Sequence, residues 1–252
     1  MYQKQLIHFP LSIGNYDSFL EIIITLASGK ISSYICIANV HMFIEAYNDK
    51  NFIQIIKKAN IVTPDGMPLT WGLYLLNGIK QERVSGMDLL PDLLNGVIKN
   101  NLSVYFYGGS SALLDRTNIF LKDKFPLLKV AGFYSPPFRE LTLKHNKQII
   151  DEINFSNANI VFVILGCPKQ EKWMGAMKGK INACMIGIGG ALPVMVGLQK
   201  RAPKWMQKLG MEWFFRLCQE PRRLFRRYAI TNTFFFYLLF KEFIKIRMFK
   251  LK

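Results

Sequence analysis

The chain has 252 residues, of which 50% are hydrophobic and 20% are charged. This composition excludes a disordered protein, and the length is sufficient for one large α/β domain with an additional segment. The four cysteines form no Cys-x-x-Cys pair and there are only three histidines, so a zinc site or a disulfide framework is not expected.

Positive charge is concentrated in the last fifth of the chain. The formal net charge is +16, and residues 199–252 contain 14 basic and 3 acidic side chains, so this segment carries most of it. Such a concentration indicates a polyanionic partner, which could be nucleic acid, an anionic membrane surface or a phosphorylated substrate. We therefore expect a catalytic core, 1–198, and a basic, amphipathic appendage, 199–252.

No stretch of the sequence predicts a membrane span or a secretory signal. Polar residues interrupt the first ten positions, so we expect a cytoplasmic protein. Residues 181–199 are uncharged, but glycines and a proline punctuate them. Residues 228–240 are more apolar, with four phenylalanines, but are too short to cross a bilayer and could lie in its interface.

Apolar periodicity predicts an alternation of helices and strands. The expected helices cover residues 15–28, 42–58, 69–76, 89–98, 113–124 and 141–153. The expected strands cover residues 34–38, 61–65, 104–107, 129–133, 160–165 and 185–190. Some of these ranges include the residues that directly follow the strand. Several of these strands are apolar throughout, as in sheets buried on both faces, so the pattern predicts an α/β fold with a mostly parallel sheet flanked by helices.

Polar residues stand where the predicted strands end, which is where open α/β sheets bind ligands. Asp65 follows one strand within the turn Thr63–Gly66, and Arg83 and Asp88 come shortly after it. Taken alone, Pro-Asp-Gly is typical of an ordinary turn. Asn39 follows another strand, and taken alone it is typical of a helix N-cap.

Glycine-rich exits follow two further strands. Gly108 and Gly109 precede a serine pair and a helix, an arrangement whose free N–H groups attract phosphate. Gly187 and Gly189 do not complete a dinucleotide fingerprint, because Leu192 occupies the third glycine position. No Asp-x-Asp metal clamp is present, so protein groups must neutralise any leaving phosphate.

The basic segment has an amphipathic pattern. Trp205, Leu209, Trp213 and Leu217 recur every four residues, with basic residues among them, which predicts a helix from about Ala202. Glu220-Pro221 interrupts this helix, and four arginines follow, Arg222, Arg223, Arg226 and Arg227. Their mixture with leucine and phenylalanine indicates a membrane-surface anchor with phosphate-binding capacity.

The order of these motifs resembles the WecG/TagA/CpsF glycosyltransferases of bacterial cell-envelope polysaccharide synthesis. The resemblance covers most of the chain. It rests on Asn39, Pro64-Asp65-Gly66, Arg83 with Gly86-x-Asp88, Gly108-Gly109, Gly166-x-Pro168-Lys169-Gln170-Glu171-x-Trp173, Gly187-x-Gly189, Arg201-Ala202-Pro203-x-Trp205, Glu212-Trp213-x-x-Arg216, Glu220-Pro221-x-Arg223 and Arg226-Arg227-Tyr228.

The resemblance implies a Rossmann-like core and an inverting, metal-independent transfer from a UDP-sugar to a sugar on undecaprenyl diphosphate, without a cofactor. It implies that the appendage touches the inner face of the cell membrane and completes the active site. By motif position, Asp65 is the expected base. The expected substrate-binding residues are Asn39, Arg83, Asp88, Gly108, Gly109, Lys169, Gln170, Gly187 and Gly189. The residues expected to face diphosphate or membrane are Arg216, Arg222, Arg223, Arg226 and Arg227.

Two positions depart from the family pattern. Ile37 stands where the family often has threonine, and Leu192-Pro193 stands where a Phe-Asp pair is common. Both bear on the identity of the donor sugar.

Two other function classes fit part of the sequence. A nucleotide-binding oxidoreductase would suit the sheet but lacks the glycine fingerprint. A nucleic-acid-binding module would suit the charge, but the basic residues flank an apolar phenylalanine run, so no nucleic-acid partner is expected.

Overall fold

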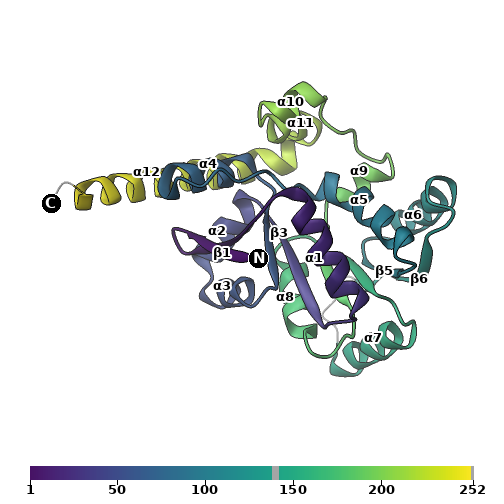
Figure 1. The fold of residues 1–252 in the computed structure, drawn as a ribbon. Coiled ribbons are helices and arrows are strands. Elements are labelled where there is room, and N and C mark those ends of the chain that lie inside the picture. Colours follow the sequence, from purple (N-terminus) through teal and green to yellow (C-terminus); the bar gives the residue numbers. More distant parts are fainter. Residues whose placement is uncertain (138–141, 251–252) are drawn as a thin grey trace.

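The computed structural model describes residues 1–137 and 142–250, and its centre is a six-stranded parallel sheet (Figure 1). The strand order is β4-β3-β8-β7-β5-β6. The strands are β3 (Ser33–Ala38), β4 (Ile61–Pro64), β5 (Ser103–Gly108), β6 (Lys129–Tyr134), β7 (Ile160–Ile164) and β8 (Cys184–Gly187). All neighbouring pairs are parallel, which confirms the predicted α/β fold.

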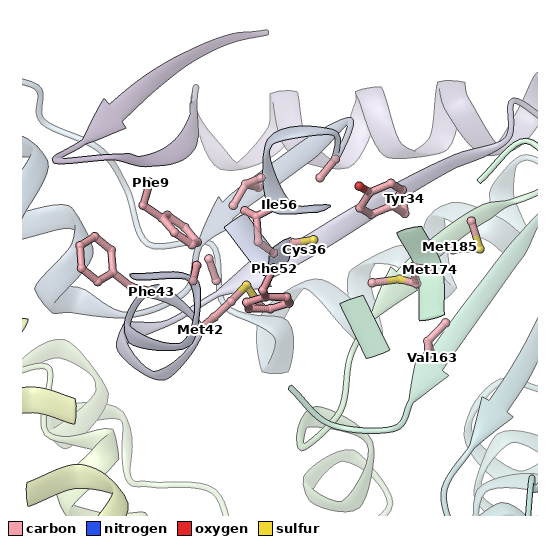
Figure 2. Packing of buried hydrophobic residues seen from close by; sticks show 14 of the residues in the cluster. Phe9, Tyr34, Cys36, Met42, Phe43, Phe52, Ile56, Val163, Met174 and Met185 are labelled. Carbon is pink, nitrogen blue, oxygen red and sulfur yellow. The ribbon is translucent and has the colours of Figure 1, made fainter. Parts of the chain in front are cut away.

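Helices cover both faces of the sheet, because its strands bury alternate side chains in two separate cores. On β3, Tyr34 and Cys36 enter one core with α2 and α3, whereas Ile35 and Ile37 enter the other with α1 and α5. Figure 2 shows the first core. The helices of this part are α1 (Tyr16–Ser28), α2 (Val40–Asn48), α3 (Lys50–Lys57), α4 (Met67–Asn77), α5 (Gly86–Lys99), α6 (Ser111–Lys124), α7 (Leu143–Phe155), α8 (Lys169–Met177) and α9 (Ala191–Met195).

The single helix predicted over 42–58 is wrong in one respect, because it is two helices that meet at Asp49. This residue has an extended backbone, with φ −119° and ψ 104°. Its carboxylate accepts hydrogen bonds from the backbone N–H groups of Asn51 and Phe52 and so caps α3. An aspartate that caps a new helix interrupts the apolar periodicity only slightly, which is why the two helices resembled one.

An N-terminal hairpin, which the sequence pattern did not predict, lies beside the edge strand β4. It consists of β1 (Tyr2–Leu6) and β2 (Phe9–Ile13) in antiparallel register. The Ser12 hydroxyl accepts a hydrogen bond from the Val62 backbone N–H at 3.0 Å. The hairpin therefore covers part of an edge that would otherwise expose unpaired backbone groups.

The basic segment folds into α10 (Lys204–Lys208), α11 (Glu212–Gln219) and α12 (Pro221–Lys250). The predicted continuous helix from Ala202 is therefore wrong, because Gly210 turns the chain with a left-handed φ of 71°. The predicted interruption at Glu220-Pro221 is confirmed, since α12 begins at Pro221. Within the described ranges, no helix is long and apolar enough to cross a bilayer.

Helix α12 is joined to the core along its middle. It lies along α4, and its last turns extend beyond the rest of the chain (Figure 1). Phe235 is buried, and its ring meets that of Phe43 on α2 edge to face, with centroids 5.0 Å apart. Leu238 and Leu239 are buried in the same core. The division at 198/199 stays a prediction, and any cut there would uncover these side chains.

Candidate active site

A cavity of about 130 Å³ lies at the carboxyl ends of β3 and β4, between the sheet and the C-terminal helices. The core and the C-terminal segment both contribute its walls. Its polar lining consists of Asn39, His41, Asp65, Arg83, Ser85, Glu212, Arg216, Arg227, Tyr228, Thr231 and Asn232. Three of these residues are arginines and two are acidic, so the cavity suits an anionic ligand that also carries hydrogen-bonding groups.

Asp65 is placed in this cavity by the end of the edge strand. Its backbone N–H donates to the Ala38 carbonyl at 2.8 Å, which continues the pairing of β3 and β4 by one residue. The next residue, Gly66, is the N-cap of α4 and offers no capping side chain. The Asp65 carboxyl therefore lies between the end of a strand and the start of a helix and lines the cavity.

Burial raises the pKa of the Asp65 carboxyl to about 6. The charge of Glu212 acts in the same direction, whereas Arg83, Arg216 and the Ser85 hydroxyl favour the ionised form. At neutral pH the group is therefore mostly ionised but a better proton acceptor than an exposed aspartate. A carboxylate with these properties suits general-base catalysis near pH 7.

Arg83 lies beside Asp65 because the segment before α5 runs along the end of β4. The Val84 backbone N–H donates to the Pro64 carbonyl at 3.0 Å. The Arg83 guanidinium contacts two carboxylates, with Nη1 2.6 Å from Glu212 Oε2 and Nη2 3.5 Å from Asp88 Oδ2. Asp88 also pairs with Arg201, so it links α5 to the C-terminal segment instead of lining the cavity.

Asn39 combines the two roles expected for it. Its Oδ1 accepts the Met42 backbone N–H at 3.2 Å and caps α2, as the N-cap interpretation predicted. The side chain also lines the cavity. Since the oxygen serves the helix, the amide nitrogen is the group that can donate to a ligand.

Gln170 lies beneath the glycine loop after β8 and does not line the cavity. Its Oε1 accepts from the Gly166 N–H at 3.2 Å, and its Nε2 donates to Glu171 Oε1 at 2.7 Å. A Cβ atom at Gly187 would lie 2.8 Å from Gln170 Nε2, and one at Gly189 would lie 3.1 Å from Oε1. These glycines therefore allow the loop to rest on the amide.

The other expected substrate-binding residues lie at the same edge of the sheet but outside the cavity. Gly108 ends β5, which is separated from β8 by β7, Gly109 follows it, and both glycines have left-handed φ values. Lys169 is exposed at the start of α8. Their roles stay predictions.

The predicted basic residues divide into two groups. Arg216 and Arg227 are half-buried and line the cavity, and a Cβ at Gly190 would lie 3.0 Å from an Arg216 guanidinium nitrogen. Arg222, Arg223 and Arg226 are exposed on the first turns of α12. The first group can contact a bound phosphate in the cavity, whereas the second faces solvent.

Two cavity residues were given no role from the sequence, although Glu212 belongs to the motif Glu212-Trp213-x-x-Arg216. Glu212 is buried, and it is one of three acidic residues in the C-terminal segment, an unusual position that could have drawn attention. His41 follows Asn39 by two residues, and burial together with the charge of Arg227 lowers its pKa to about 4. A lone histidine just before the expected helix over 42–58 gave no indication of this position.

The two departures from the family pattern are packing positions. Ile37 is buried, and a Cβ on Gly86 would lie 3.3 Å from its Cδ1 atom. Leu192 on α9 is fully buried in the same core. Neither side chain lines the cavity around Asp65.

An open parallel sheet with an acidic and arginine-rich cavity at its carboxyl edge is the arrangement of an enzyme that acts on phosphate-bearing ligands. The family model of the glycosyl transferase WecG/TagA/CpsF family matches residues 4–248. The chain therefore belongs to this family and is a glycosyltransferase. The oxidoreductase and nucleic-acid alternatives are accordingly not adopted.

Curated relatives agree with this membership. The chain is 30% identical over 237 residues to an N-acetylglucosaminyldiphosphoundecaprenol N-acetyl-beta-D-mannosaminyltransferase of Bacillus subtilis (strain 168), covering 91% of both chains. It is 30% identical to the enzyme of the same name from Bacillus spizizenii, covering 91% of this chain and 87% of the relative. It is 25% identical to the one from Staphylococcus aureus (strain MW2), covering 85% and 82%.

Proposed function

We propose that the protein is an inverting, metal-independent glycosyltransferase that moves a sugar from a UDP-sugar to N-acetylglucosamine on undecaprenyl diphosphate. The acceptor follows from the names of the relatives, which also make an N-acetylmannosaminyl donor the first to test. The observation that carries the proposal is one carboxylate, Asp65, with a raised pKa, in a cavity that also contains Arg216 and Arg227. The product would serve cell-envelope polysaccharide synthesis.

The proposed reaction is one in-line displacement. The Asp65 carboxylate takes the proton of an acceptor hydroxyl, and the oxygen attacks the anomeric carbon of the donor from the face opposite UDP. A new glycosidic bond forms as the bond between that carbon and the UDP oxygen breaks, so the configuration inverts. A positioned base of this kind typically contributes about 10²–10⁴-fold to the rate.

Charge on the departing diphosphate would be stabilised by protein groups. Arg216 and Arg227 line the cavity, and guanidinium groups bind phosphate oxygens in pairs. Burial lowers the pKa of Arg227, so this group is held in a poorly hydrated position where its attraction to an anion is strong. Among the described residues, no group of three or more His, Cys, Asp or Glu side chains could hold a metal ion.

We further propose that α12 rests on the inner face of the cell membrane. Phe236, Phe240, Ile244 and Met248 recur every four residues on α12 and are between 41% and 64% exposed. Exposed basic residues accompany them, including Lys241 and Lys245. An apolar stripe bordered by positive charge is typical of a helix that lies in the surface of an anionic bilayer.

The transferase proposal is tested by UDP release from the full chain, with a panel of UDP-sugars and a short-chain prenyl-diphospho-N-acetylglucosamine, in the presence of EDTA. We expect release that depends on the acceptor, occurs with one donor and is unchanged by EDTA. Release that requires a divalent cation would overturn the metal-independent part. If no donor supports release and calorimetry detects no UDP binding, the proposal is wrong.

A further inference from the structure

Glu212 is a second carboxylate in the cavity, and one of its oxygens has no partner. The residue is 9% exposed, and its Oε2 accepts a hydrogen bond from Arg83 Nη1 at 2.6 Å. Its Oε1 is buried and has no hydrogen-bond partner among the described residues. Buried carboxylate oxygens are rarely left unpaired, because the hydration lost on burial is then not replaced.

Arg83 connects the Glu212 side chain to the surroundings of the base. Its guanidinium bonds Glu212 directly, and its charge also acts on the Asp65 carboxyl. All three groups line the same cavity. The charges of both Arg83 and Glu212 act on the Asp65 carboxyl, so one sugar ring bound in this cavity can present hydroxyl groups to both carboxylates.

A sugar provides the donor that Glu212 lacks. Carboxylates are acceptors only, and pyranose hydroxyls are the neutral donors that a glycosyltransferase site receives in number. Arginines are the other strong donors in the cavity, and Arg83 is already committed to Oε2. The ring concerned is that of the acceptor, because the acceptor hydroxyl must reach Asp65, which shares Arg83 with Glu212.

From this geometry we infer that Glu212 Oε1 accepts a hydrogen bond from a second, non-reacting hydroxyl of the acceptor sugar while the reacting hydroxyl faces Asp65. The inference rests on the proposed function and adds a specificity-determining residue to it. It also gives the C-terminal segment a direct role in choosing the acceptor. A ring that lacked this hydroxyl, or presented it in the opposite orientation, would leave the buried oxygen unpaired.

The experiment measures binding, by calorimetry without donor, of short-chain prenyl-diphospho-N-acetylglucosamine and of analogues in which one ring hydroxyl is replaced by hydrogen. Wild type is compared with Glu212→Gln. In this variant the donor-only guanidinium of Arg83 selects the amide oxygen, so an amide NH₂ group faces the cavity instead of an acceptor. Glu220→Gln is the matched control, because Glu220 lies at the end of α11 outside the cavity and pairs with Arg223.

We expect wild type and Glu220→Gln to bind one non-reacting deoxy analogue at least tenfold more weakly than the full acceptor. Glu212→Gln should bind the full acceptor and that analogue with similar affinity, because the variant has already lost the hydrogen bond that the analogue cannot make. The inference is overturned if the affinity losses caused by Glu212→Gln and by the missing hydroxyl multiply. It is also overturned if wild type distinguishes none of the analogues. A wild-type series without discrimination overturns the inference even if Glu212→Gln does not fold.

Failure of the inference and failure of the proposed function give different results. Wild type that binds the full acceptor without distinguishing the analogues contradicts the role of Glu212 alone. Wild type that does not bind the full acceptor contradicts the proposed function, and the inference falls with it.

Discussion

Arg83 Nη1 lies 2.6 Å from Glu212 Oε2, although the two residues are 129 positions apart in the chain. This ion pair joins the segment after the edge strand to the basic C-terminal helices directly beside Asp65. The electrostatic environment of the proposed base therefore depends on residues from both parts of the chain. Docking of the C-terminal segment and basicity at Asp65 are physically coupled.

The pH dependence of activity should reveal this coupling. We expect kcat/KM to fall as the pH decreases through about 6, because Asp65 must be ionised to accept a proton. Glu212→Gln removes a negative charge that raises the Asp65 pKa, so the acidic limb should move to lower pH. The measurement is a pH profile of UDP release at low acceptor concentration. An unmoved limb in Glu212→Gln, with Glu220→Gln as control, would show that the two carboxylates do not interact.

Asp65→Asn should stabilise the protein at neutral pH. The pKa of the carboxyl is about 6 in the folded chain and 3.8 in the reference state, so folding favours the protonated form. The stability that this proton contributes is present below about pH 3.8 and is lost as the pH rises through about 6. Asparagine does not ionise, so Asp65→Asn keeps this stability at higher pH. At pH 7.5 its free energy of unfolding should exceed that of wild type by on the order of 1–3 kcal/mol.

Thermal or urea unfolding of wild type and Asp65→Asn, at pH 4.5 and 7.5, measures this gain. The difference in free energy of unfolding between the two proteins should be larger at pH 7.5 than at pH 4.5. A difference that is larger at pH 4.5 would mean that the folded chain favours the ionised form.

Arg216→Ala and Arg227→Ala should each lower kcat/KM by about 10²–10³-fold, because each removes a charged donor from the cavity that receives the diphosphate. Arg116→Ala removes an exposed arginine from α6 and serves as the control. Kinetics with a short-chain acceptor measures these effects without a membrane. Losses no larger than that of the control would exclude a diphosphate role.

Phe240→Ser combined with Met248→Ser should weaken binding to anionic vesicles by at least tenfold, because two large apolar side chains would no longer enter the bilayer surface. Phe155→Ser is the matched control, since Phe155 is 94% exposed at the end of α7. Sedimentation with anionic and neutral vesicles provides the measurement. Equal sedimentation of the two variants would show that α12 does not carry the contact.

The sheet was predictable because several of its strands are apolar throughout and end at polar or glycine-rich turns. The N-terminal hairpin was not, since β1 has four exposed residues of mixed polarity and pairs only locally. The break at Asp49 was hidden because capping depends on a backbone turn that the apolar pattern does not record.

For the site, Asp65, Asn39, Arg83, Arg216 and Arg227 were expected and do lie together. The sequence did not place Glu212 or His41 in the site, because the cavity forms only when the C-terminal helices fold back on the sheet. Such contacts between distant residues leave no local pattern in one chain. For the same reason, the burial of Gln170 beneath the glycine loop could not be anticipated.

The most direct test of this account is acceptor-dependent UDP release by wild type and by Asp65→Asn, measured with the active donor and EDTA, with UDP affinity determined in parallel by calorimetry. The account predicts that the variant loses at least about 10²-fold in turnover, while UDP affinity stays within a few-fold. Turnover by Asp65→Asn close to that of wild type would contradict the central claim that Asp65 is the base.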